Sequence, residues 1–101
     1  MKIEGDKIKG VNKSEMIGRL LHLGATVVEF NSNNGWGFGG AVGKRYTLKN
    51  NIVVTIGEAC FRHTGTTKFI RVDYDGKYGV IDLHQTQTGF AKVYNFVNEN
   101  I

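Results

Sequence analysis

The sequence contains no proline, one cysteine and no long apolar run. A single cysteine excludes an intramolecular disulfide framework, and Cys60 therefore fits a reducing compartment. No apolar segment approaches the roughly 18 residues that a membrane span requires, and the polar first ten residues do not resemble a secretory signal. Without proline, the turns must rely on the 14 glycines and on asparagine. We therefore expect a cytoplasmic protein.

Acidic residues are scarce in the middle of the chain, although 22% of all residues are charged and the formal net charge is +4. Between Phe30 and Val72 the only acid is Glu58, whereas this segment holds six basic residues. This imbalance predicts a basic surface and an acidic partner. A content of 41% hydrophobic and 11% aromatic residues suffices for a core, so we expect residues 1–101 to form a single compact domain.

The clearest element is a β-hairpin over Thr66–Gln85, in which β-branched and aromatic residues alternate on either side of Asp75-Gly76. A two-residue loop at this dipeptide predicts that Ile70 faces Ile81. The same register pairs Tyr74 with Lys77 and Val72 with Gly79. One face of the hairpin is then expected to be buried, and it consists of Ile70, Val72, Ile81 and Leu83.

Two helices are expected at the ends of the chain. Asn12 and Glu15 have the spacing of a capping box, and Gly24 supplies a left-handed residue after an apolar stripe, which predicts a helix over Lys13–Leu23. Apolar residues at helical spacing predict a second helix from Phe90 to about Asn98. A strand over Phe90–Val97 stays open as an alternative, because valine, tyrosine and phenylalanine also favour sheets.

Short strands separated by glycine and asparagine fill the region between the helices. They are predicted at Ala25–Phe30, Trp36–Val42, Arg45–Lys49 and Ile52–Ile56, with a break at Gly43-Lys44, a turn at Asn50-Asn51 and an extension over Ala59–Arg62 after a bulge at Gly57. Residues 1–11 are expected to form an edge strand or an arm. Because no strand–helix–strand unit occurs, we predict an α+β fold with an antiparallel sheet of about five strands, or a partly closed barrel.

Several catalytic and ligand-binding patterns are incomplete. The glycine-rich stretch Asn34–Gly40 matches neither the P-loop nor the dinucleotide fingerprint. Cys60 and His63 could present two metal ligands, with His84 as a third, but nothing else clusters suitably for a zinc site. We therefore expect no metal and no cofactor.

An acid–base site is a further alternative. Asp73 and Asp82 share one face of the predicted hairpin, and His63 or His84 could complete a small hydrolase or nuclease. Arg71 lies between the two aspartates, which favours a network of ion pairs instead.

Aromatic residues interleaved with basic residues give the strongest functional signal, because proteins that bind single strands stack bases on exposed rings and neutralise phosphates with lysine and arginine. Trp36 and Phe38 would share one face of a strand. They could equally be core residues. The candidate binding residues are Trp36, Phe38, Lys44, Arg45, Tyr46, Lys49, Arg62, Lys68 and Arg71.

These observations favour a small, non-enzymatic binding protein whose partner is acidic: nucleic acid, a nucleoprotein complex or a host protein that normally holds nucleic acid. The size and the composition are typical of an accessory or inhibitor protein of a phage or mobile element. A protein interaction module or homodimer without a role in nucleic-acid binding is the alternative.

Overall fold

The computed structural model describes residues 2–5, 7–32, 38–61, 65–74 and 79–101. A two-stranded hairpin is followed by a helix, five consecutive strands and a second helix. The elements are β1 (Lys2–Glu4), β2 (Lys7–Lys9), α1 (Lys13–His22), β3 (Thr26–Ser32), β4 (Phe38–Thr47), the 3₁₀ helix η1 (Lys49–Asn51), β5 (Ile52–Phe61), β6 (Gly65–Tyr74), β7 (Gly79–His84) and α2 (Gln87–Asn100).

The five long strands form one antiparallel sheet in the order β3-β4-β5-β6-β7. Each strand pairs with its sequence neighbour, so the α+β prediction with about five antiparallel strands is confirmed. The sheet is open, with β3 and β7 at its edges, and it is not a closed barrel. No helix in the described part of the chain is long and apolar enough to cross a membrane.

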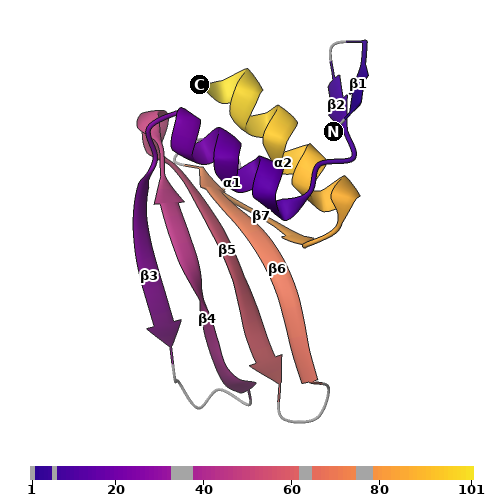
Figure 1. Cartoon of the computed structure of the whole chain (residues 1–101). Coiled ribbons are helices and arrows are strands. Elements are labelled where there is room, and N and C mark those ends of the chain that lie inside the picture. Colours follow the sequence, from indigo (N-terminus) through magenta and orange to yellow (C-terminus); the bar gives the residue numbers. More distant parts are fainter. Residues whose placement is uncertain (1, 6, 33–37, 62–64, 75–78) are drawn as a thin grey trace.

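Both helices lie over one end of one face of the sheet, and β3 to β6 extend well beyond them (Figure 1). The core fills the space between this face and the helices. It is formed mainly by Val11, Met16, Leu20, Tyr46, Ile52, Val54, Ile56, Ile70, Val72, Phe90, Val93 and Val97, all of which are at least 96% buried. The other end of the sheet therefore stands free of the helical layer.

The capping box predicted for α1 is present. The Asn12 side chain accepts a hydrogen bond from the Glu15 amide at 2.8 Å, and the Glu15 carboxylate accepts one from the Asn12 amide at 3.1 Å. The helix ends at His22, with Leu23 as its C-cap and Gly24 at a φ of +82°. The hydrogen bond from the Asn12 amide lowers the pKa of Glu15, because it stabilises the ionised carboxylate.

The second helix exists as predicted, and the alternative strand over Phe90–Val97 does not. It is longer than the apolar spacing suggested, because Thr86 caps it: the Thr86 hydroxyl accepts a hydrogen bond from the Gly89 amide at 2.9 Å. Gln87, Thr88 and Gly89, which precede the predicted start at Phe90, therefore belong to the first turn of α2.

The register predicted for β6 and β7 is wrong by two residues. Ile70 faces Leu83, Val72 faces Ile81 and Tyr74 faces Gly79, so four residues connect the strands rather than two; Asp75-Gly76 lies outside the described residues. Because side chains alternate with a period of two, a shift of two keeps every side chain on its face. Ile70 and Val72 are buried, and Ile81 and Leu83 pack against the core, as the sequence predicted.

The predicted break at Gly43-Lys44 and the bulge at Gly57 are both absent. Strand β4 runs through Gly43, and Gly57 lies in regular register opposite Gly43 on one side and Phe69 on the other. The irregularity lies instead between Phe38 and Gly40. The predicted turn at Asn50-Asn51 is confirmed, and both residues have positive φ, at 63° and 61°.

The described residues among 1–11 form neither an edge strand of the main sheet nor a loose arm. Within the described part of the chain, β1 and β2 pair with each other and with no strand of the main sheet. The Asn95 side chain attaches β2 to α2. Asn95 Oδ1 accepts from the Ile8 amide and Asn95 Nδ2 donates to the Ile8 carbonyl, both at 2.9 Å. The asparagine amide therefore bonds the backbone of β2 as a second neighbouring strand would.

We predict that Gly57→Ala lowers the free energy of unfolding by about 2–3 kcal/mol, because the added methyl group would overpack the sheet. A Cβ at position 57 would lie 2.6 Å from the Val42 carbonyl oxygen, whereas a Cβ at Gly18 on α1 would meet nothing within 4 Å. Gly18→Ala is the matched control and should stabilise the protein by about 0.5–1 kcal/mol. Urea unfolding measures both; equal effects would contradict the close approach at Gly57.

We predict that Asn95→Asp frees the N-terminal hairpin from α2. Aspartate can still accept from the Ile8 amide but cannot donate to the Ile8 carbonyl, so one hydrogen bond of about 1 kcal/mol is replaced by repulsion. Hydrogen exchange at the Ile8 amide should accelerate at least fivefold. Asn98→Asp is the control, because Asn98 accepts a hydrogen bond from Arg19 Nε at 3.0 Å and aspartate preserves that role.

Candidate functional site

The candidate site lies on the face of the sheet opposite the helices, which no helix in the described ranges covers (Figure 1). Strand alternation relative to the buried residues Val54, Ile56, Ile70 and Val72 assigns side chains to this face. We call it the open face and define it by Val28, Phe30, Arg45, Thr55, Phe69, Arg71, Asp82 and His84.

Two phenylalanine rings meet at the centre of the open face. Phe30, Gly43, Gly57 and Phe69 form one row across four strands. A Cβ at Gly57 would lie 3.3 Å from Phe30 Cζ and 3.2 Å from Phe69 Cζ. Because neither glycine has a side chain, the rings of Phe30 and Phe69 can extend from β3 and β6 over the backbone between them. Both phenylalanines remain partly exposed.

An arginine lies against the first of these rings. Arg45 Cζ is 4.9 Å from the centroid of the Phe30 ring, within the range of a cation–π interaction. The partners of Arg45 across the sheet are Val28 and Thr55, so no acid stands directly opposite it. Arg45 is exposed, and its guanidinium group lies over the Phe30 ring.

Acidic side chains outnumber basic ones near β7. Arg71 Nε lies 3.4 Å from Asp73 Oδ1, and Asp82 stands directly opposite Arg71, so two aspartates surround one arginine. Arg71 and Asp82 border a hollow of about 440 Å³, whose full lining is Ala41, Ala59, Phe69, Arg71, Asp82, Leu83 and His84. The positive charge of the open face is thus concentrated at Arg45.

Three other predicted basic residues, Lys44, Lys49 and Lys68, do not join Arg45 and Arg71 on this face. Lys44 and Lys68 point to the side of the helices, where Lys44 is opposite Glu29 and Lys68 Nζ lies 3.9 Å from Glu58 Oε1. Lys49 belongs to η1, which lies by the C-terminus of α2 because Asn50 Nδ2 donates to the Asn100 carbonyl.

None of the aromatic residues predicted for the site is placed on the open face among the described side chains. Tyr46 is 2% exposed in the core, so it cannot contribute to a surface, and burial raises the pKa of its phenol. Trp36 and Arg62 lie outside the described residues, as does the side chain of Phe38, whose backbone begins β4. Sequence reasoning missed Phe30 and Phe69 as candidate binding residues. Phe69 shares strand alternation with Arg71, and this signal could have identified it.

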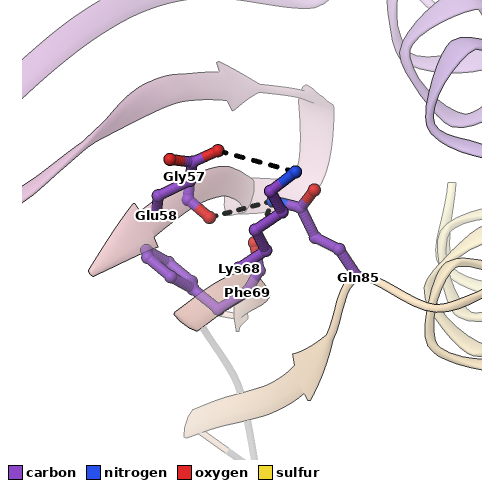
Figure 2. A network of polar contacts seen from close by, with 5 residues as sticks. All are labelled: Gly57, Glu58, Lys68, Phe69 and Gln85. Atoms are coloured by element: carbon purple, nitrogen blue, oxygen red, sulfur yellow. Dashed lines mark hydrogen bonds and ion pairs between the residues drawn. The ribbon is translucent and has the colours of Figure 1, made fainter. Parts of the chain in front are cut away.

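Gln85 fixes the backbone directly behind the phenylalanine pair. Its Nε2 donates to the Gly57 carbonyl and to the Phe69 carbonyl, both at 2.9 Å. Figure 2 shows the side chain reaching from the end of β7 toward β5 and β6, next to the Lys68–Glu58 pair. One amide group therefore holds together the two strands that carry Gly57 and Phe69.

The described residues give little support to a metal site or to an acid–base site. No three histidine, cysteine, aspartate or glutamate side chains of these residues lie close enough to hold a metal ion. His63 lies outside the described residues, and Asp73 and Asp82 both lie near Arg71 rather than around a shared proton. A comparison of the chain with protein-family models, with curated proteins and with solved structures found no match.

We predict that Gln85→Glu destabilises the protein at neutral pH more than Gln85→Ala does, because a carboxylate would face two carbonyl oxygens. This environment should raise the pKa of the introduced glutamate above its ordinary value. The excess destabilisation should therefore be present at neutral pH and disappear below pH of about 4, where the carboxyl group is protonated in both states. Thermal unfolding as a function of pH measures this; a loss independent of pH would contradict the assignment.

Proposed function

We propose that this protein is a small, non-enzymatic binding protein of the cytoplasm, and that its open face binds an acidic partner. Single-stranded nucleic acid, free or within a nucleoprotein complex, fits this face best. The observation that carries the proposal is the stack of Arg45 on Phe30, next to the partly exposed ring of Phe69.

The arrangement offers what a single strand requires. Unstacked bases can pack on aromatic rings and on guanidinium planes, whose donors also reach phosphate oxygens. Phe30 and Arg45 supply one such platform, and Phe69 supplies another beside the hollow that Ala41 and Ala59 border. Small residues around the rings keep the surface flat enough for a nucleotide chain to approach.

The charge distribution supports the same reading. The protein carries a formal charge of +4, which favours approach of a polyanion. Asp73 and Asp82 counter Arg71, so binding should depend more on Arg45 than on Arg71. An accessory or inhibitor role in a phage or mobile element fits this proposal and rests on size and composition alone.

We expect Arg45→Glu to weaken binding at least tenfold. The assay is fluorescence anisotropy with labelled oligo(dT) and oligo(rU) of about 20 nucleotides. Between about 50 and 200 mM salt, the logarithm of the affinity should fall linearly with the logarithm of the salt concentration, because each phosphate contact releases counterions. Phe69→Leu should weaken binding about fivefold or more without changing the salt slope, since stacking carries no charge.

Lys49→Glu is the matched control for charge. It changes the net charge by the same amount as Arg45→Glu but lies in η1, at the helical end of the molecule. Equal weakening by the two variants would mean that only net charge matters. Absence of binding at low salt, or binding insensitive to salt, would contradict the proposal.

A further inference from the structure

A second surface, separate from the open face, lies between α2 and the edge of the sheet at β7. It is a cleft of about 480 Å³. Val72, Ile81 and Leu83 line it from the sheet, and Val93 and Phe96 line it from α2. Ile81 and Leu83 are only partly buried, so the protein's own core does not complete the packing here.

The cleft adjoins an unpaired strand edge. Strand β7 pairs with β6 on one side, and no other strand in the described part of the chain pairs with its second side. An edge strand presents a row of backbone donors and acceptors that can pair with another extended chain. Ile81 and Leu83 occupy alternate positions of this strand and face the cleft. Every second side chain of an added strand would point to the same face and could pack against them.

The aromatic wall of the cleft is fixed in place. The Phe96 ring packs edge-to-face on Tyr74, with centroids 5.4 Å apart and planes at 89°. Asn95, which also lines the cleft, is held by its two hydrogen bonds to Ile8. An incoming segment would therefore meet a preformed surface and would not need to order it first.

The charges around the cleft favour an acidic segment. Lys7 and Lys92 line it together with a single acid, Glu99. Lys92 and Glu99 are seven residues apart on α2, which separates them by about 10 Å along the helix. The lining of the cleft thus has two basic side chains and one acidic side chain, and the acid is separated from Lys92 along the helix.

We propose that this cleft binds an extended peptide segment of a partner protein, which adds to β7 as a sixth strand. The segment inserts alternate apolar side chains against Ile81, Leu83 and Phe96, and it places an acidic side chain beside Lys92. The occupant is a protein segment and not nucleic acid, because the cleft is predominantly apolar. This site is independent of the open face and extends the proposed function.

The test is selection from a displayed library of random nine-residue peptides with the full-length protein as bait. Enriched sequences should carry apolar residues at every second position and aspartate or glutamate near one end. With Lys92→Glu as bait, enrichment should shift away from acidic sequences, and the original peptides should bind at least tenfold more weakly. Enrichment of nothing, or of sequences that Lys92→Glu binds equally well, would overturn the proposal.

Two measurements locate the bound peptide. Amide chemical shifts should change along Gly79–His84 and along α2, and a copy of the peptide with alternate backbone nitrogens methylated should lose binding, because it cannot pair with the strand edge. Shifts confined to β3 or to the open face would overturn the site. Arg45→Glu should leave peptide affinity unchanged, and Lys92→Glu should leave oligonucleotide affinity within about twofold, so that either function can fail without the other.

Discussion

The close approach of β4 and β5 at Gly43 and Gly57 is the constraint on which the rest of the sheet depends. A side chain at either position would collide with backbone atoms of the neighbouring strand. Because both positions lack a side chain, Phe30 and Phe69 can lie over Gly57 on one face, while the Gln85 amide binds the carbonyls of Gly57 and Phe69. Glycine normally weakens a strand; here the rings and the amide compensate for it.

This arrangement explains how a sheet with helices over only one end of one face remains ordered. At the helical end, the side chains of Tyr46, Val54 and Val72 are buried between the sheet and the helices α1 and α2. Beyond the helices, neither face has a covering layer within the described residues, and cohesion depends on strand pairing. Arg45 and Phe69 stand at the border of the core, because each is followed in its strand by a buried residue, Tyr46 and Ile70. The exposed rings and the arginine therefore lie on the back of the last core layer, and the aromatic pair and Gln85 continue the packing there.

Much of the fold could be predicted from local patterns, because a capping box, a glycine stop and strand alternation are local effects. The two helices, the antiparallel sheet of about five strands and the buried face of β6 and β7 were predicted correctly. The length of the connection after Tyr74 and the role of Gly57 could not be, since both depend on contacts between strands. The candidate site was less well predicted: Lys44, Arg45 and Tyr46 were grouped on one surface, although consecutive strand residues must alternate.

The glycine pair and Gln85 also define what a divergent sequence would need in order to keep this architecture. Surface charges, the N-terminal hairpin and most core residues could be exchanged for others of similar character. Three features have no simple replacements. They are the two glycines opposite each other in adjacent strands, the ring on each side of them, and the side-chain amide one residue after β7. The spacing of Gly43, Gly57 and Gln85 is therefore a compact signature by which proteins of this shape could be recognised after overall sequence similarity has been lost.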